Sequence, residues 1–185
     1  MTRLVFLLLL IFVAGFGCTM PRLIVLHDSL NARQHNDLGV AYEARGESDL
    51  AVREYERAAE LDRKWARPLI NLANVFAFRR DWTAAEKSLT RALERDPGSS
   101  EGMNNLAWVQ LRSGRLQSAL AWSQRALALD PEEPNYLDTL ADIQAALGDV
   151  DGARRSLRRA LALTSSPAMA ESLREKIIRL STDPP

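Results

Sequence analysis

The sequence has very little of the chemistry on which most enzymes and metal proteins depend. Its 185 residues include one cysteine, Cys18, which excludes an internal disulfide framework and a zinc site with several thiolate ligands. Only two histidines occur, His27 and His35, and neither can be assembled into a catalytic group with a serine or cysteine and an acid. Glycine-rich phosphate loops and paired metal ligands are also lacking. We therefore expect no enzymatic activity, no metal and no cofactor.

An excess of charge of one sign is lacking as well. The chain has 24 basic and 24 acidic residues, so no global field would draw it onto nucleic acid or an acidic membrane. We expect no nucleic-acid partner, and we infer no small-molecule substrate. One basic cluster could meet an acidic partner, or it could be a solvated or ion-paired face. It consists of Arg154, Arg155, Arg158 and Arg159.

A motif recurs along the chain at a constant spacing of 34 residues. Residues 126–131 read Ala-Leu-Ala-Leu-Asp-Pro, and residues 92–97 read Ala-Leu-Glu-Arg-Asp-Pro. The related stretches 58–63 and 160–163 fall in the same register. The content of hydrophobic residues is 46% and that of aromatic residues only 6%, which favours helix over sheet. The sequence therefore predicts an all-α chain of repeated helical units.

Small and apolar residues hold fixed columns within these units. Leucine stands at Leu38, Leu72, Leu106 and Leu140. Two alanine columns follow, one with Ala51, Ala85, Ala119 and Ala153 and one with Ala58, Ala92, Ala126 and Ala160. Where two helices cross, only a small side chain lets the backbones approach closely. We expect these alanines to lie at helix crossings.

With these columns, and with Leu38, Gly39 and Tyr42 in a Leu-Gly-x-x-Tyr motif, the chain resembles the tetratricopeptide repeat family. The resemblance implies a right-handed α-solenoid of four helix-turn-helix repeats. Their expected ranges are 32–65, 66–99, 100–133 and 134–167. Residues 168–185 are expected to form a capping helix and a tail, because a repeat array needs a closing element. The apolar stripe of that helix would hold Met169, Leu173, Ile177 and Leu180.

The turns within the repeats follow one pattern with one exception. Gly46, Gly114 and Gly148 stand where a left-handed cap would end the first helix. Arg80 stands there in the second repeat, so its backbone is either left-handed, at about 1 kcal/mol, or part of a different turn. Caps at helix starts are expected at Asn31, Asp81 and Asp149.

The resemblance also implies that the first helix of each repeat faces a concave groove. Asparagine amides donate and accept, so a row of them could hold an extended peptide backbone, while Phe78 and Trp108 would offer apolar anchors. The alternative is a solvated polar face with Trp108 packed on a neighbouring helix. The candidate groove residues are Asn36, Asn71, Asn74, Phe78, Asn104, Asn105, Trp108 and Arg112.

One binding mode of the family can be tested on the sequence. The carboxylate clamp that holds chaperone C-termini needs lysine, arginine and asparagine at five positions. These positions hold Asn36, Val40, Asn71, Glu101 and Asn105, and only Asn71 agrees. We therefore expect no binding of chaperone tails.

The N-terminus has the layout of an export signal. A short basic head, Met1 to Arg3, precedes an apolar run from Leu4 to Val13 and a segment rich in small residues. This run is shorter than the roughly 20 residues of a membrane-spanning helix, which favours a cleaved signal. The alternative is an uncleaved anchor extended through residues 23–26, which would have to tolerate a proline and an arginine.

Gly17 and Cys18 match the last two positions of a bacterial lipoprotein signal, which this segment resembles. That resemblance implies a signal peptide over 1–17, acylation of Cys18 and a tether over 18–31. Two or more acyl chains would anchor the protein stably in a bilayer. Thr19, which is not aspartate, implies the outer membrane, facing the periplasm. The alternative is cleavage by the ordinary signal peptidase, which leaves Cys18 as a spare thiol.

Together these features predict a membrane-anchored scaffold or assembly factor of the bacterial envelope that binds a peptide or partner protein in its groove. The chain looks like tetratricopeptide lipoproteins that assemble pilus or secretion machinery, including secretin pilotins. The alternative is an accessory lipoprotein to an envelope peptidase or exopolysaccharide export system. An enzyme is the remaining alternative.

Overall fold

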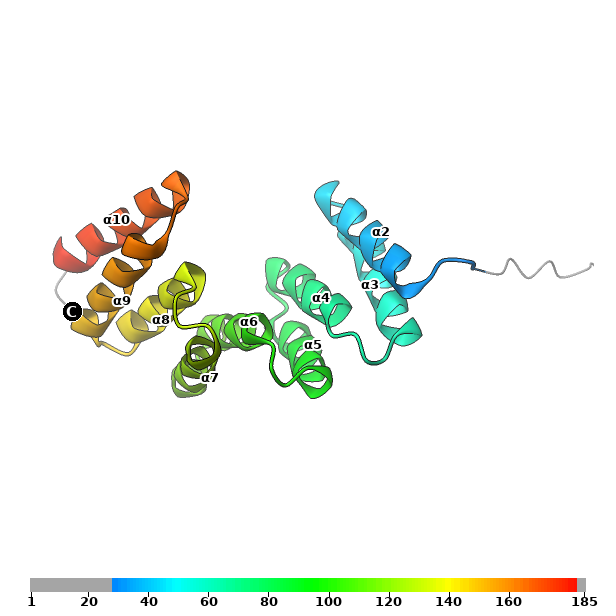
Figure 1. The fold of residues 1–185 in the computed structure, drawn as a ribbon, viewed down its shortest axis with the longest axis horizontal. Coiled ribbons are helices and arrows are strands. Elements are labelled where there is room, and N and C mark those ends of the chain that lie inside the picture. The colour runs from blue at the N-terminus through cyan, green and yellow to red at the C-terminus, as the bar shows by residue number, and fades with distance from the viewer. Residues whose placement is uncertain (1–27, 183–185) are drawn as a thin grey trace, which may run out of the picture.

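A computed structural model describes residues 28–182, which form nine α-helices and no strand (Figure 1). The all-α prediction is confirmed. The predicted signal peptide, Cys18 and most of the tether lie outside the described residues. Among the residues described, no helix combines the length and apolarity needed to cross a bilayer. The helices are α2 (Ala32–Ala44), α3 (Ser48–Leu61), α4 (Arg67–Phe78), α5 (Trp82–Arg95), α6 (Ser100–Arg112), α7 (Leu116–Leu129), α8 (Pro134–Ala146), α9 (Val150–Leu163) and α10 (Pro167–Thr182).

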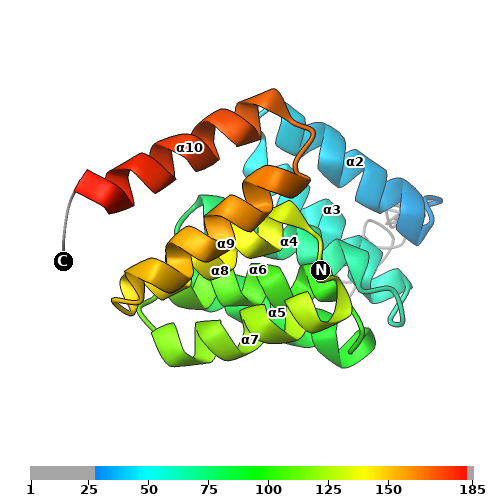
Figure 2. The same ribbon diagram turned by 60° about the vertical axis from the view of Figure 1, so that its left-hand side comes forward.

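The helices stack as a solenoid, as predicted. Consecutive helices lie side by side in both views, and they follow an arc in Figure 1 (Figures 1 and 2). Contacts also join α2 with α4, α4 with α6, and α6 with α8. The first helices of the pairs therefore form a continuous row, which is the row that positions the candidate site.

Local hydrogen bonds fix where the helices begin. Asn31 Oδ1 accepts from the backbone of Gln34 at 3.0 Å, and the Gln34 side chain accepts from the backbone of Asn31 at 2.9 Å. This reciprocal pair is a capping box, which satisfies two amides that the helix itself cannot pair. Asp81 caps α5 and Asp149 caps α9 through their side-chain oxygens. All three predicted caps are confirmed.

The turns after α2, α6 and α8 hold glycine with positive φ, at 75° for Gly46, 80° for Gly114 and 84° for Gly148. Arg80 adopts the same left-handed conformation, with φ of 61°. The second repeat therefore keeps the turn and accepts the strain of a side chain there, about 1 kcal/mol.

The core lies where the alanine columns predict it. All eight alanines of the two columns are 0% exposed, because each stands where the backbones of two helices approach. The clusters around them run from one pair into the next, as Met103 and Tyr136 do in the cluster that also contains Leu89. The packing is thus continuous along the array.

Helix α10 closes the C-terminal end of the core. It begins at Pro167, one residue before the predicted range, and its Leu173 is 1% exposed. Met169, Ile177 and Leu180 pack against the same cluster as Leu173, which also includes Leu137 of α8. The predicted apolar stripe is confirmed.

Candidate functional site

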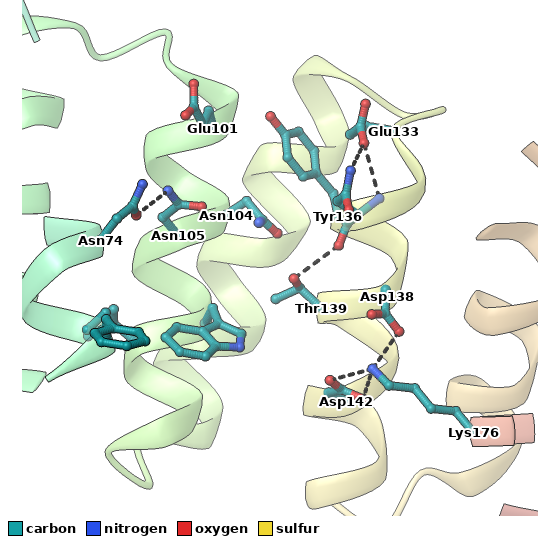
Figure 3. Close-up of a pocket in the computed structure, with 15 residues that line it drawn as sticks. Asn74, Glu101, Asn104, Asn105, Glu133, Tyr136, Asp138, Thr139, Asp142 and Lys176 are labelled. Carbon is teal, nitrogen blue, oxygen red and sulfur yellow. Dashed lines mark hydrogen bonds and ion pairs between the residues drawn. The ribbon is translucent and has the colours of Figure 1, made fainter. Parts of the chain in front are cut away.

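A groove of about 830 Å³ lies along α4, α6 and α8 and reaches α10 (Figure 3). Five of the eight predicted groove residues line it: Asn74, Phe78, Asn104, Asn105 and Trp108. They come from the first helices of the second and third repeats. The structure thus brings together candidates that are separated along the chain.

The other three candidates lie outside this lining. Asn36 is 7% exposed, and its Oδ1 accepts from Asn71 Nδ2 at 2.9 Å, so the two amides join α2 to α4. Arg112 lines a smaller pocket beside Trp108. In the first repeat the position of Asn36 therefore lies against α4, although the same column lines the groove at Asn104 and Asp138.

Asn74 and Asn105 link α4 to α6 on the exposed surface of the groove. Asn105 Nδ2 donates to Asn74 Oδ1 at 3.2 Å, as Figure 3 shows. One such bond uses one donor of Asn105 and one lone pair of Asn74, and each amide has further donors and lone pairs. The pair is therefore held in place and can still bind a peptide backbone.

Asn104 sits deeper, between α6 and α8. It is 8% exposed, and its Oδ1 has no hydrogen-bond partner among the described residues. In Figure 3 its side chain points into the space between the two helices. An unpaired buried polar group lowers the stability of the folded protein by about 1–3 kcal/mol. A ligand that donates a hydrogen bond to this oxygen would remove that cost.

Two aromatic residues form an apolar edge of the groove. Phe78 is 85% exposed and Trp108 is 36% exposed. The Trp108 ring meets Trp82 of α5 edge to face, with ring centroids 5.8 Å apart. The Arg112 guanidinium lies 5.8 Å from the centroid of Trp82 and 5.9 Å from that of Trp108. Trp108 is therefore held by its neighbours and still reaches the groove. The predicted packing of Trp108 on a neighbouring helix is observed, and 36% of the residue stays exposed towards the groove.

The opposite side of the groove carries charge. Lys176 Nζ of α10 donates to Asp138 Oδ1 at 2.7 Å and to both carboxylate oxygens of Asp142 at 2.9 Å (Figure 3). Burial raises the pKa of Asp138, although the hydrogen bond and charge of Lys176 act to lower it. Burial acts to lower the pKa of Lys176, but its bonds to the two aspartates outweigh this and raise it. Both shifts favour a bound proton, as expected where one ammonium serves two carboxylates.

Lys176 lines the groove, and our interpretation of the sequence did not place it there. It lies in the predicted capping helix, outside the apolar stripe of that helix. It stands 34 residues after Asp142, in the column that also holds Asn74 and Trp108. Extending the repeat register into α10 would have placed it in the groove. Trp82, which supports Trp108 from a second helix, had no such signal.

Glu101, Glu133 and Tyr136 lie at one end of the groove (Figure 3). Glu101 pairs with Arg67, and Glu133 caps α8 by accepting from the backbone of Asn135 at 3.2 Å. The Tyr136 hydroxyl lies 3.2 Å from Ser100 Oγ, and burial is the main cause that raises its pKa. This end therefore presents fixed carboxylates beside a phenol ring.

Over residues 28–182, no group of three or more His, Cys, Asp or Glu side chains is arranged to hold a metal ion. His35 is 3% exposed and lies between Asp28 and Glu54, at 3.1 Å and 2.6 Å. In the arginine cluster, Arg154 contacts Asp151 and donates to the Leu180 carbonyl. Arg159 donates to the Pro131 carbonyl. These two arginines therefore have intramolecular partners, as an ion-paired face would require.

Comparison with protein families gives one consistent result. Family models described as tetratricopeptide repeat match residues 32–64, 70–134 and 136–159. These matches cover most of α2 to α9. A comparison with curated proteins finds no match.

Solved structures share the fold at low sequence identity. A structure solved in the functional characterisation of Pseudomonas aeruginosa pilF matches with a TM-score of 0.69 at 22% identity. The match covers 83% of this chain and 70% of that one. The crystal structure of MamA protein gives 0.66 at 19% identity, over 81% and 87%. The first repeat domain of Spaghetti (RPAP3), bound to the HSP90 peptide SRMEEVD, gives 0.61 at 20% identity, over 66% and 98%.

Proposed function

Because the chain belongs to the tetratricopeptide repeat family, we propose that it is a membrane-anchored interaction scaffold of the bacterial envelope. It binds an extended peptide or a partner protein in the groove along α4, α6, α8 and α10. The observation that carries the proposal is the pairing of an exposed aromatic edge with amides that keep hydrogen-bonding capacity. A pilotin-like role in pilus or secretion assembly is the version that the lipoprotein resemblance supports.

The clamp positions argue against one kind of ligand. The RPAP3 domain, which shares this fold, was solved with an HSP90 peptide. Here Val40 is exposed, Glu101 is paired with Arg67, and Asn36 is buried, so three clamp positions offer no cation to a C-terminal carboxylate. The proposed ligand is therefore an internal extended segment.

Replacing both aromatics tests the groove. The full-length chain, the variant Phe78→Ser/Trp108→Ala and a control are used to capture partners from a bacterial envelope fraction. The control, Leu129→Ser/Ile178→Ser, removes side chains that are 54% and 62% exposed outside the groove. We expect the groove variant to lose a partner that the control retains.

Thermal unfolding of each variant separates loss of binding from loss of folding, because Trp108 also packs on Trp82. A folded groove variant that captures the same partner as the wild type excludes the groove.

Mass spectrometry of the membrane fraction tests the anchor. The proposal rests on the sequence around Gly17 and Cys18. We expect Cys18 at the mature N-terminus and acylated, and we expect Cys18→Ser to prevent acylation. A soluble mature chain with an unmodified Cys18 would reject the anchor and leave the groove proposal intact.

A further inference from the structure

The lining of the groove is short of positive charge. It contains four carboxylates, on Glu101, Glu133, Asp138 and Asp142, and one ammonium, on Lys176. Arg67 neutralises Glu101, and Lys176 is shared between the two aspartates. Among the described residues, Glu133 has no ion-pair partner. The groove therefore keeps about two uncompensated negative charges beside its aromatic edge.

The ion pair of Asp138 with Lys176 is also partly removed from water, whereas the side chain of Asp142 is 41% exposed. Asp138 and Lys176 have side-chain exposures of 27% and 28%, which places their ion pair in the wall and not at the open surface. Interactions between partly buried charges are screened less than those at the surface. A second cation near this wall would meet negative charge that Lys176 alone does not balance.

Asn104 gives an independent indication of a ligand. Its Oδ1 has no partner among the described residues, although the residue is only 8% exposed and its side chain points into the same groove. An acidic surface that only keeps the protein soluble needs no such amide. A ligand with hydrogen-bond donors, such as a peptide backbone, would pair it.

We propose that the groove takes an extended basic segment of a partner protein. This inference rests on the proposed function and names the chemistry of its ligand. The backbone of the segment pairs with Asn104 and with the exposed amides of Asn74 and Asn105. One lysine or arginine side chain meets Glu133 and another meets the Asp138 and Asp142 pair, because the two sites lie at opposite ends of the groove in Figure 3. A neighbouring apolar side chain covers Phe78 and Trp108.

Peptide pools of defined composition test the proposal. The probes are fluorescein-labelled dodecapeptide pools built from Gly, Ser and Leu with Lys, with Glu or with Gln. Their affinity for the full-length chain is measured by fluorescence anisotropy. We expect the lysine pool to bind at least about tenfold more tightly than the glutamine pool, since charge complementarity separates them. We expect no measurable binding of the glutamate pool.

Two substitutions then move the affinity in opposite directions. Asp138→Asn/Asp142→Asn should weaken binding of the lysine pool about tenfold, whereas Lys176→Gln should strengthen it, because it uncovers both carboxylates. The control Glu56→Gln/Glu94→Gln removes two exposed carboxylates from α3 and α5 and should leave the affinity unchanged. If the aspartate and lysine variants both weaken binding, the cluster is structural and the proposal is wrong.

The outcomes also separate this inference from the proposed function. If the glutamine pool binds as tightly as the lysine pool and Phe78→Ser/Trp108→Ala abolishes that binding, the groove binds peptide but not basic peptide. Equal weakening by the control variant would mean that net charge, and not the groove, attracts the lysine pool. If no pool binds, the basic ligand is rejected, and the capture experiment decides the proposed function.

Discussion

The first and third repeats fill the same helix crossing in opposite ways. In the first, the 0% exposed ring of Tyr55 lies against Gly39, and a Cβ built there would come within 2.6 Å of the ring. In the third repeat, the positions equivalent to Gly39 and Tyr55 hold Ala107 and Ser123, both 0% exposed. In the first repeat, a large ring packs against the backbone of a glycine. In the third repeat, the same crossing is filled by two small side chains.

The polar atoms of the two crossings differ as well. The Tyr55 hydroxyl donates to Glu43 at 2.7 Å, whereas Ser123 Oγ and Gln110 Oε1 have no partner among the described residues. Gln110 instead donates to Glu86 of the preceding repeat at 2.9 Å. The third repeat thus depends more on its neighbours. It is also the repeat that carries Asn104, Asn105 and Trp108, so the densest set of groove residues sits on the less self-sufficient unit.

The largest effect is expected from Tyr55→Ala, which empties the crossing of the first repeat. The free energy of unfolding should fall by about 3–5 kcal/mol, because a buried aromatic leaves a cavity that its rigid surroundings cannot fill. Urea titration followed by circular dichroism measures this. The exposed Val40→Ala serves as a control on the same repeat. A loss below about 1 kcal/mol would mean that the ring does not hold the first repeat together.

Gly39→Ala should have a smaller effect of the same sign. Alanine favours the helix by about 1 kcal/mol, but its Cβ collides with the Tyr55 ring, so the net loss should be about 1–2 kcal/mol. The double variant Gly39→Ala/Tyr55→Leu reproduces Ala73 and Leu89 of the second repeat. It should be more stable than the sum of the two single changes predicts, and additive changes would contradict a direct contact.

Ser123→Ala should act in the opposite direction. It removes a buried hydroxyl that has no partner among the described residues, and alanine is the better helix former. The free energy of unfolding should rise by about 1 kcal/mol, measured by the same titration. A loss of stability would show that the hydroxyl is paired in solution. The polar atoms of the first and third repeats would then differ less than described above.

The smallest effect concerns pH at the contact between the second and third repeats. Burial acts to raise the pKa of Glu86, but hydrogen bonds from Arg115 and Gln110 outweigh it and lower the pKa below its ordinary value of 4.5. The stabilisation is therefore present above that value and is lost as pH falls through the lower pKa of the folded state. The difference in unfolding free energy between wild type and Glu86→Gln should shrink in acid. If the difference in unfolding free energy between the two proteins did not change with pH, ionised Glu86 would not contribute to stability.

Much of the fold could be predicted because the repeat columns report local geometry directly. The alanine columns, the caps at Asn31, Asp81 and Asp149 and the stripe of α10 depend on residues close in sequence or at one fixed spacing. The site could be predicted only in part. Asn74 and Trp108 follow from one column that faces the groove, but Asn36 pairs with Asn71 of α4 although Asn104, in its column, lines the groove.

By itself the sequence determined the helices, their order and the crossings at which they pack, since spacing and side-chain size fix these. Only the tertiary structure decided which polar residues share the groove. It placed Lys176 between Asp138 and Asp142, left Asn104 buried without a partner among the described residues, and held Trp108 against Trp82. These contacts join helices of different repeats, and their geometry depends on how far each pair rotates against the next. That rotation is a property of the packed array and not of any one repeat.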